Sequence, residues 1–533
     1  MATSPTETLG KLKQAARERW NSNQAGKTRV VVQVGHCSQA VGAREVSDSL
    51  ASSLPDNAYL TIAGCDGACF AAPQVLISTG DGGRTRIAHA RPEATVAHLS
   101  GAPNGAEVAD GQAQAFFERQ RRVSLNRCGE LDSTDAGDYI LAGGYAGLAR
   151  ALSMPPEEVI EEVKASGLRG RGGAYFPAAL KWEGARKVEA ESRYLVVNSE
   201  EGEPGVFKDR HLMEGVPHRI LEGAIIAGYA SGVKRAYIYI NAEANLSAER
   251  VQKAVDDAAE LGLVGDHILG SGYSLNVEIL RGAGGYVCGE ETTILNTLEG
   301  YRREPRLRPP FPTEAGLWAK PTIINNAETL ANVPFILANG AAAFSKIGKG
   351  EASGTKIVSL SGSVQRPGVA EVPLGTTLRE IITDIGGGPP AGHTLIGVAV
   401  GGPSSGVFPT SMLDTPIAPG RLHDTGIMLG AGGVIALDER SNVLDVVRRL
   451  AAYNAKESCG KCTPCREGTP RIVDAIDRLI SGSGSSGDLD ELRYLSEVVS
   501  LASLCGLGQA AGTPINSALH FFGDEMAALA TSS

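Results

Sequence analysis

Three closely spaced cysteines and a distant fourth constrain this chain more than any other feature. Cys459, Cys462 and Cys465 lie in the segment ESCGKCTPCREG, and Cys505 follows 40 residues after the third. A CxxCxxC turn lets successive thiolates converge on one metal centre, and a remote cysteine completes the ligand set of a [4Fe–4S] cluster. A structural zinc ion held by four thiolates is the alternative, although zinc sites more often combine two CxxC pairs. The motif predicts a metal-bearing domain over residues 439–533.

Composition excludes several functional classes. The 533 residues suffice for three or four domains. The 50 basic and 60 acidic residues give a net charge of −10, so there is no basic footprint for nucleic acid. The chain has no apolar run long enough for a membrane span, and its first 24 residues lack the apolar core of a signal peptide. Nine cysteines in close groups fit reduced metal ligands, so we expect a cytoplasmic protein.

The N-terminal part predicts a helix within residues 1–28 and a small α/β domain over 29–105. Its β-rich runs and helical stretches alternate as in thioredoxin-like ferredoxin domains, which the segment resembles. Those domains hold a [2Fe–2S] cluster on four cysteines, whereas this chain offers three: Cys37, Cys65 and Cys69. Two interpretations stay open. Either a substitute ligand such as His36 completes a second cluster, or the domain is degenerate and serves packing and docking.

The largest predicted domain spans 141–350 and follows a Gly-, Asp- and Gln-rich linker at 106–140. Its strand and helix patterns alternate, and this βαβ order implies a parallel, Rossmann-like sheet. A small β-grasp (SLBB-like) module is predicted over 351–438, followed by the helical bundle that carries the four cysteines. The expected fold is therefore a multidomain α/β protein with a C-terminal helical domain.

Four loops of the largest domain have the composition of a nucleotide site. The segment RGRGG at 169–173 offers backbone N–H groups to a phosphate, assisted by two arginines, but it is not the Rossmann GxGxxG. The others are the acidic NSEEGEPG at 198–205, GAGGYVCGEET at 282–292, and PTIINNAET at 321–329. Taken alone, the glycine-rich and acidic loops are also compatible with simple turns.

In this order, and followed by ESCGKCTPCREG and SLCGLG, the four loops resemble the flavoprotein subunits of the complex I 51 kDa-like family. The resemblance spans roughly residues 140–530. The family includes the NADH-binding subunit of respiratory complex I and the diaphorase subunits of NAD-linked hydrogenases and formate dehydrogenases. Because of its thioredoxin-like extension, the chain looks most like the beta (diaphorase) subunit of NAD-dependent formate dehydrogenase.

The resemblance implies one cavity for FMN, with NADH stacked on the flavin. The residues that it implies for FMN are Gly170, Gly172, Gly173, Lys181, Asn198, Glu200, Glu201, Tyr286, Gly289, Glu290, Asn325, Asn326 and Thr329. Phe176 and Phe311 match aromatic residues that enclose the adenine, and Glu203 and Glu291 match carboxylates that contact the nucleotide. Gly184 stands where some members have a third aromatic residue. The pair Glu290–Glu291 implies NAD rather than NADP, because a carboxylate repels a 2′-phosphate.

The implied activity is that of a diaphorase. Hydride passes between NAD(H) and FMN, and single electrons pass between FMN and a [4Fe–4S] cluster at Cys459, Cys462, Cys465 and Cys505. The implied partners are a small thioredoxin-like [2Fe–2S] subunit and a large catalytic subunit with molybdenum or tungsten and iron–sulfur clusters. A hydrogenase diaphorase and a complex I subunit are the alternatives, and a non-catalytic docking module is the alternative of another class. The end at Ser533, without a ferredoxin extension, speaks against electron bifurcation.

Overall fold

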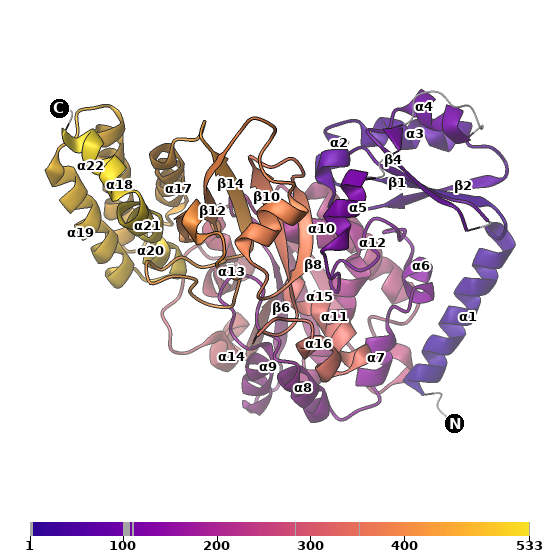
Figure 1. The fold of residues 1–533 in the computed structure, drawn as a ribbon. Coiled ribbons are helices and arrows are strands. Elements are labelled where there is room, and N and C mark those ends of the chain that lie inside the picture. Colours follow the sequence, from indigo (N-terminus) through magenta and orange to yellow (C-terminus); the bar gives the residue numbers. More distant parts are fainter. Residues whose placement is uncertain are drawn as a thin grey trace.

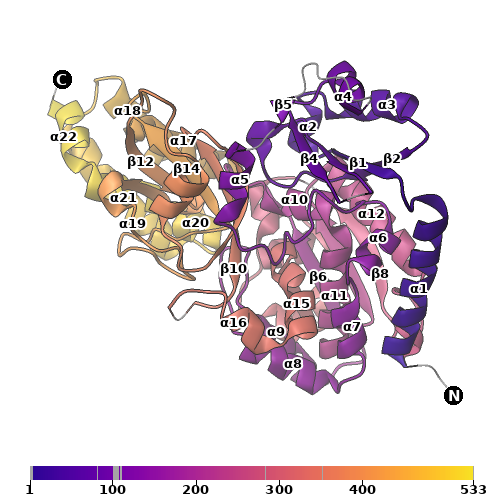
Figure 2. The same cartoon turned by 45° about the vertical axis from the view of Figure 1, so that its right-hand side comes forward.

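The computed structural model describes residues 4–80, 82–99, 107–108, 111–282, 284–350 and 352–531. Figure 1 shows the N-terminal domain at one end, the C-terminal helices at the other, and two sheets between them. The turned view in Figure 2 keeps the same order. The expected domain boundaries at 105/106 and at 351 fall outside the described residues. In the part of the chain that is described, no helix has the length and apolarity to cross a bilayer.

The N-terminal domain has the small α/β fold that its sequence predicts, built on a mixed sheet. Its five strands have the order β2-β1-β3-β4-β5, with β1 parallel to β2 and antiparallel to β3. The elements are α1 (Pro5–Asn23), β1 (Thr28–Gln33), α2 (His36–Gln39), α3 (Ala43–Ser53), β2 (Ala58–Ala63), β3 (Val75–Ser78), β4 (Arg84–Ala88), α4 (Pro92–Leu99) and β5 (Glu107–Val108). Val30 and Val32 of β1 are fully buried against the helices, which explains the apolar run in this strand.

The segment expected as a linker, 106–140, is structured where it is described. It contains α5 (Gly111–Glu118) and the start of α6 (Ala136–Leu141). Between them the buried carboxylate of Glu371 accepts hydrogen bonds from the backbone N–H groups of Val123, Ser124 and Leu125, at 2.8–2.9 Å. Three donors on one buried carboxylate fix this stretch in place. Its polar composition therefore reflects turns and caps around a buried charge rather than a free linker.

The central domain is built on a four-stranded sheet of order β8-β7-β6-β9 in which all neighbours are parallel, as predicted. The strands are β6 (Tyr194–Ser199), β7 (Arg235–Ile240), β8 (Asn276–Arg281) and β9 (Thr322–Asn326). Asn198 and Asn326 are register partners at the carboxyl ends of β6 and β9. Ligands of parallel α/β sheets bind beyond these ends, so this edge is where a site is expected.

Helices cover both faces of this sheet (Figure 1). They are α7 (Ala146–Ala151), α8 (Pro156–Ala165), α9 (Ala178–Lys187), α10 (Lys208–Gly215), α11 (Pro217–Ser231), α12 (Asn245–Glu260), α13 (Glu291–Leu298), α14 (Pro312–Ala315), α15 (Ala327–Asn339) and α16 (Ala341–Ser345). The helix α11 is buried almost throughout, and the apolar residues of α11 and α15 form one core with Leu195, Val197 and Ile238 of the strands. This core holds the carboxyl edge of the sheet rigid.

The second sheet has the order β11-β10-β14-β12-β13 and forms the predicted small β module. Its strands are β10 (Thr355–Gly362), β11 (Gly368–Pro373), β12 (Leu395–Val400), β13 (Gly406–Pro409) and β14 (Gly433–Asp438). Between β11 and β12, Glu380–Ile385 forms a π-helical turn.

The C-terminal bundle contains α17 (Val443–Glu457), α18 (Thr463–Ile480), α19 (Ser486–Ala502), α20 (Gly506–Ala510), α21 (Thr513–Phe521) and α22 (Gly523–Thr531). The sequence pattern predicts the last two as one helix. They are separate because Phe522 leaves helical geometry, at φ −128° and ψ 25°, and is buried in the core of the bundle.

Candidate functional site

Two asparagines at the carboxyl edge of the central sheet join three of the four predicted loops. The Nδ2 atom of Asn326 donates to the carbonyl oxygen of Asn198 at 3.2 Å and to Asp209 at 2.7 Å. The Nδ2 atom of Asn198 donates to the carbonyl oxygen of Gly289 at 2.9 Å. The acidic loop, the 282–292 loop and the 321–329 loop therefore meet at one place.

The glycine-rich loop packs onto the same place. The N–H of Arg171 donates to the hydroxyl of Thr329 at 2.8 Å, and a Cβ on Gly172 would lie 3.0 Å from Cβ of Asn326. Gly173 has φ +120°, which favours glycine. The guanidinium of Arg171, however, is buried and donates to the carbonyl oxygens of Thr355, Arg169 and Ser353. Of the two arginines, only Arg169 has an exposed side chain that a phosphate could reach.

Two carboxylates of the acidic loop have an oxygen without a hydrogen-bond donor. The Oε2 atom of Glu200 and the Oε1 atom of Glu203 are buried and unpaired, while the other oxygen of Glu200 accepts from Asn241 at 2.5 Å. Burial raises the pKa of Glu200 to about 7 and that of Glu203 to about 8. An unsatisfied buried oxygen is costly, and a ligand hydroxyl or amide N–H would satisfy it. These atoms therefore fit a flavin and nucleotide that lie across the loop.

Three other predicted residues are occupied by the protein itself. Glu201 accepts from the backbone N–H groups of Asp209 and Arg210, at 2.7 and 3.2 Å. Glu290 is the N-cap of α13 and accepts from two backbone N–H groups at 2.9 Å. The amide oxygen of Asn325 accepts from the indole of Trp182 at 2.8 Å. These side chains hold the ends of helices and strands that shape the site.

The aromatic pair predicted for adenine is exposed. Phe176 and Phe311 have 49% and 50% of their surface exposed, and they precede α9 and α14, which pack against each other. A Cβ on Gly184 would lie 3.8 Å from Cβ of Thr313 on α14, so a larger side chain there would point at this helix. Two exposed rings at the ends of adjoining helices are a suitable platform for a planar base.

The carboxylate of Glu291 is not a free negative charge. It forms ion pairs of 2.8 Å with both Lys181 and Arg308. Burial opposes ionisation, but these two cations hold the pKa of Glu291 below its ordinary value. The repulsion of a 2′-phosphate, on which the expectation of NAD over NADP rests, is therefore offset by adjacent positive charge.

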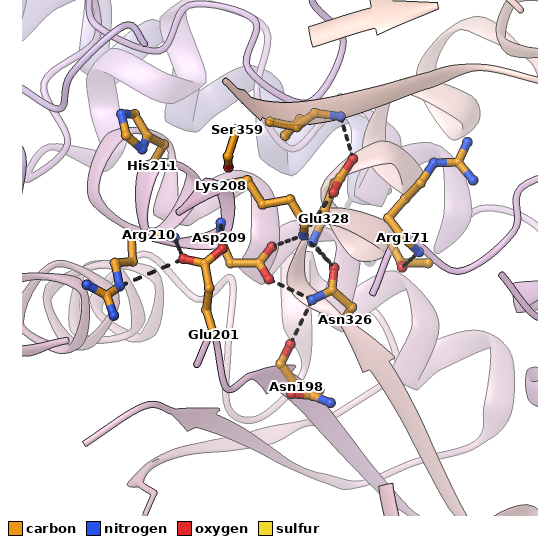
Figure 3. A network of polar contacts seen from close by, with 12 residues as sticks. Arg171, Asn198, Glu201, Lys208, Asp209, Arg210, His211, Asn326, Glu328 and Ser359 are labelled. Carbon is orange, nitrogen blue, oxygen red and sulfur yellow. Dashed lines mark hydrogen bonds and ion pairs between the residues drawn. The ribbon is translucent and has the colours of Figure 1, made fainter. Parts of the chain in front are cut away.

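A buried charge network lies directly beside Asn326 (Figure 3). The ammonium of Lys208 contacts Asp209 at 2.7 Å and Glu328 at 2.9 Å, and Lys356 of β10 contacts the same Glu328 oxygen at 2.5 Å. All four side chains are at most 5% exposed. Burial alone would lower the pKa of Lys208, but the surrounding carboxylates raise it, so the lysine stays charged. The network ties the central domain to the small β module under the site.

The four C-terminal cysteines gather against the 282–292 loop. Cys459, Cys462, Cys465 and Cys505 form one apolar cluster with Tyr286, Val287 and Leu507. The loop is anchored there, since the N–H of Tyr286 donates to Glu457 at 2.8 Å. Lys461 also contacts Glu304, which follows α13, at 3.2 Å. Burial, followed by neighbouring thiols, raises the pKa of Cys465 to about 11. Crowded, desolvated thiols of this kind fit a cluster whose positive iron stabilises all four thiolates.

The histidine beside the N-terminal cysteines is His211, not His36. The imidazole of His36 is exposed and its Nε2 lies 3.4 Å from the guanidinium of Arg210. His211 lies on α10 of the central domain, and its ligand atom is within 4.8 Å of the sulfurs of Cys65 and Cys69. Cys128 is buried and its thiol donates to the carbonyl oxygen of Cys65, as expected for a packed residue. Cys288 is likewise buried and donates to the carbonyl oxygen of Gly284.

Sequence reasoning missed Lys208, Glu328, Lys356 and His211. One signal was available for Lys208 and His211, because the run FKDRH directly follows the acidic loop and places charged residues in a buried helix. Nothing in the sequence indicates that Lys356, on a strand of another domain, meets Glu328.

Comparison with known proteins gives three matching families. Residues 163–335 match the Nuo51 FMN-binding domain, 357–408 the SLBB domain, and 445–529 the NADH-ubiquinone oxidoreductase-F iron–sulfur binding region.

Full-length relatives agree with these domain matches. The chain is 45% identical to the NADP-reducing hydrogenase subunit HndC of Solidesulfovibrio fructosivorans, over 76% of this chain and 83% of the relative. It is 44% identical to an NADH-quinone oxidoreductase subunit of Rhizobium meliloti, over 73% and 93%. Among solved structures, NAD+-reducing [NiFe]-hydrogenase in the H2-reduced state matches with a TM-score of 0.68 and 28% identity, over 99% of this chain and 93% of that one.

Proposed function

Since this chain belongs to the complex I 51 kDa-like family of FMN- and iron–sulfur-binding NADH oxidoreductase subunits, we propose that it is the diaphorase of a multi-subunit complex. The observation that carries the proposal is the position of the 282–292 loop. Gly289 of this loop is bonded to Asn198 at the carboxyl edge of the sheet, and Val287 packs against the four cysteines. One short loop thus separates the proposed flavin pocket from the cluster.

When bound, FMN supplies the exchange between two-electron hydride chemistry and one-electron chemistry. The chain's own residues provide the surroundings for this exchange. The unpaired oxygens of Glu200 and Glu203 accept from ligand donors, and Phe176 and Phe311 hold the adenine between them. The glycine loop lets backbone N–H groups approach a phosphate closely. The site residues need only bind and orient the two rings and exclude water.

The contact between the 282–292 loop and the four cysteines determines how electrons pass from the flavin pocket to the cluster. Tyr286 and Val287 lie against Cys465 and Cys505 within one apolar cluster, so no water layer is needed between the pocket wall and the cysteine sulfurs. The hydrogen bond that the N–H of Tyr286 donates to Glu457 keeps the loop in this position. Replacing Glu457 with Gln preserves a weaker acceptor, whereas Ala removes it. We expect slower intramolecular electron transfer for Glu457→Ala than for Glu457→Gln, at unchanged iron and flavin content.

We propose formate as the electron donor of the whole complex, with a molybdenum- or tungsten-containing catalytic subunit and a small thioredoxin-like [2Fe–2S] subunit as partners. The support is the thioredoxin-like extension before the flavin domain, which resembles that of formate dehydrogenase diaphorases. A hydrogenase is the second candidate. The observation that favours it is that the likeness to the NAD+-reducing [NiFe]-hydrogenase extends over 99% of this chain, the N-terminal domain included.

One experiment decides between the two donors. The tagged chain is isolated from its own host with its bound subunits, and NAD reduction is measured with formate and with H2. Molybdenum, tungsten and nickel are measured in the same preparation. Formate-dependent reduction with molybdenum or tungsten supports our proposal. H2-dependent reduction with nickel overturns the formate assignment and leaves the diaphorase assignment unchanged. A preparation that contains no FMN and does not oxidise NADH contradicts both assignments.

A further inference from the structure

The contact between the N-terminal domain and α10 contains a convergent set of metal-ligand atoms. The sulfurs of Cys65 and Cys69 and a ring nitrogen of His211 all lie within 4.8 Å of one another, and two of the three side chains are buried. The set joins two domains, since the cysteines belong to the loop after β2 and the histidine belongs to α10. Neither the NADH and FMN site nor the C-terminal cluster uses these residues.

The imidazole of His211 is oriented as a ligand. Its Nδ1 lies 2.8 Å from the carbonyl oxygen of Phe207, which can only accept, so Nδ1 carries the proton. The lone pair of the neutral ring is therefore on Nε2, and this atom faces the sulfur of Cys69 at 3.9 Å. A metal-bound histidine characteristically donates its other N–H to a backbone carbonyl, which fixes the tautomer and the ring plane.

A third thiol, that of Cys37, lies near the set. Cys37 is exposed and lies outside the set of three whose ligand atoms are all within 4.8 Å of one another, but its thiol is next to that of Cys69. Three thiolates and one imidazole are a characteristic tetrahedral ligand set for zinc.

The packing around the group leaves its ligands little freedom. A Cβ on Gly64 would come within 2.4 Å of the Cα of Gly215, so the cysteine loop lies directly on the end of α10. The backbone N–H of His36 donates to Glu214 of α10 at 2.7 Å, which fixes the loop that carries Cys37. The ligand-bearing loops and the helix are thus held together independently of any metal.

The spacing of Cys65, Cys69 and His211 favours one ion over a cluster. Zinc–sulfur and zinc–nitrogen bonds of about 2.3 and 2.0 Å place ligand atoms of one tetrahedral ion less than about 4 Å apart. Ligands on the two irons of a [2Fe–2S] cluster stand farther apart, because the irons themselves are separate. The C-terminal quartet gives an internal comparison: no three of Cys459, Cys462, Cys465 and Cys505, all of them described in the structure, form a comparably close set. The N-terminal group is therefore more compact than the site for the [4Fe–4S] cluster.

We propose a single tetrahedral metal ion of the zinc class at this interface, bound by Cys65, Cys69 and His211, with Cys37 as the fourth ligand from the exposed side. It joins the N-terminal domain to α10, the helix whose first residues Lys208 and Asp209 belong to the charge network beneath the flavin pocket. The proposal does not depend on which donor feeds the complex. It replaces the [2Fe–2S] cluster as the occupant of this domain and His36 as its fourth ligand.

The test uses the full chain produced with zinc and iron and isolated without chelators. Zinc, iron and acid-labile sulfide are measured per chain, and X-ray absorption is recorded at the zinc edge, where neither flavin nor iron interferes. We expect about one zinc, with three sulfur neighbours at about 2.3 Å and one nitrogen at about 2.0 Å. The iron content of the C-terminal cluster, which is remote from this site and should hold four irons, is measured in each preparation to show that the chain has folded.

Two histidine variants form a matched pair. His211→Gln is expected to lower the zinc retained after mild chelation at least about tenfold, while His36→Gln keeps it. His211→Cys is the control for misfolding, because this variant should retain zinc with four sulfur neighbours and no nitrogen. The proposal is overturned if the wild-type chain holds no zinc, if the two Gln variants lose zinc equally, or if two additional irons and matching sulfide occupy the domain.

Discussion

Glu328 holds two buried lysines together, and its replacement by Gln is a stringent test of the network beneath the site. Its carboxylate accepts from Lys208 at 2.9 Å, from Lys356 at 2.5 Å and from the N–H of Ile357 at 2.8 Å. The three charged side chains are at most 1% exposed. Glu328→Gln leaves Lys208 paired with Asp209 but removes the ion pair of Lys356, whose pKa burial already lowers to about 8, so the Lys356 ammonium loses its contacting carboxylate.

Removing one partner of a buried ion pair typically costs about 3–5 kcal/mol of unfolding free energy. For a domain of this size that corresponds to a fall of roughly 6–20 °C in the unfolding midpoint. Lys356→Met in the same chain removes the surplus positive charge, so the double variant is expected to be more stable than Glu328→Gln alone. The coupling between the two sites should be about 1–3 kcal/mol.

Thermal unfolding followed by circular dichroism measures these shifts, with flavin release as a second signal from the same domain. Glu157→Gln is the matched control, because Glu157 is also paired with an arginine, Arg186, but its side chain is 64% exposed. We expect no resolvable shift for the control. A Glu328→Gln midpoint within about 2 °C of wild type, or strictly additive single and double variants, refutes the reasoning.

Three further predictions concern the pocket. Burial raises the pKa of Glu203 from 4.5 to about 8, so the folded chain binds the extra proton between these values. Without ligands, the stability should fall as pH rises from about 5 to about 8, and Glu203→Gln should reduce this slope in urea titrations, leaving the part that Glu200 contributes up to about pH 7. Phe176→Ala should raise KM for NADH about fivefold at nearly constant kcat, while Phe176→Trp restores it; an unchanged KM excludes stacking. Gly172→Ala, whose Cβ would press on Asn326 at 3.0 Å, should weaken FMN retention in gel filtration, with Gly184→Ala, where the added Cβ has room, as control.

The elements that depend on local pattern were predictable from the sequence. Apolar runs separated by helical patterns predict β6, β7 and β8 with the helices between them. The parallel sheet buries β6 and β7 on both faces, whereas β8 at its edge is partly exposed. Loop composition at residues 198–205 pointed to the carboxyl edge of this sheet, and the structure places Asn198 and Asn326 there in register. The cysteine spacing likewise located the C-terminal bundle.

Features that depend on contacts between distant segments were not predictable. Lys356 is 28 residues from Glu328 and lies in another domain, yet the two form one ion pair. His211 meets Cys69 across 142 residues, whereas His36, which precedes Cys37 in the sequence, points to Arg210. Composition also misled at 106–140, where a polar stretch wraps around the buried carboxylate of Glu371. Such partners follow from tertiary packing, which residue spacing does not encode.

The central claim is that NADH, a flavin and the four-cysteine cluster form one electron path within this chain. The most direct measurement is the anaerobic addition of NADH to the purified chain, with flavin absorbance and the electron paramagnetic resonance of reduced iron–sulfur clusters recorded together. We predict flavin bleaching and a cluster signal in the wild type. In Cys505→Ser, which lacks the fourth thiolate, we predict bleaching without that signal. A cluster signal that survives in Cys505→Ser, or a wild-type flavin that NADH reduces without any cluster signal, would contradict the account.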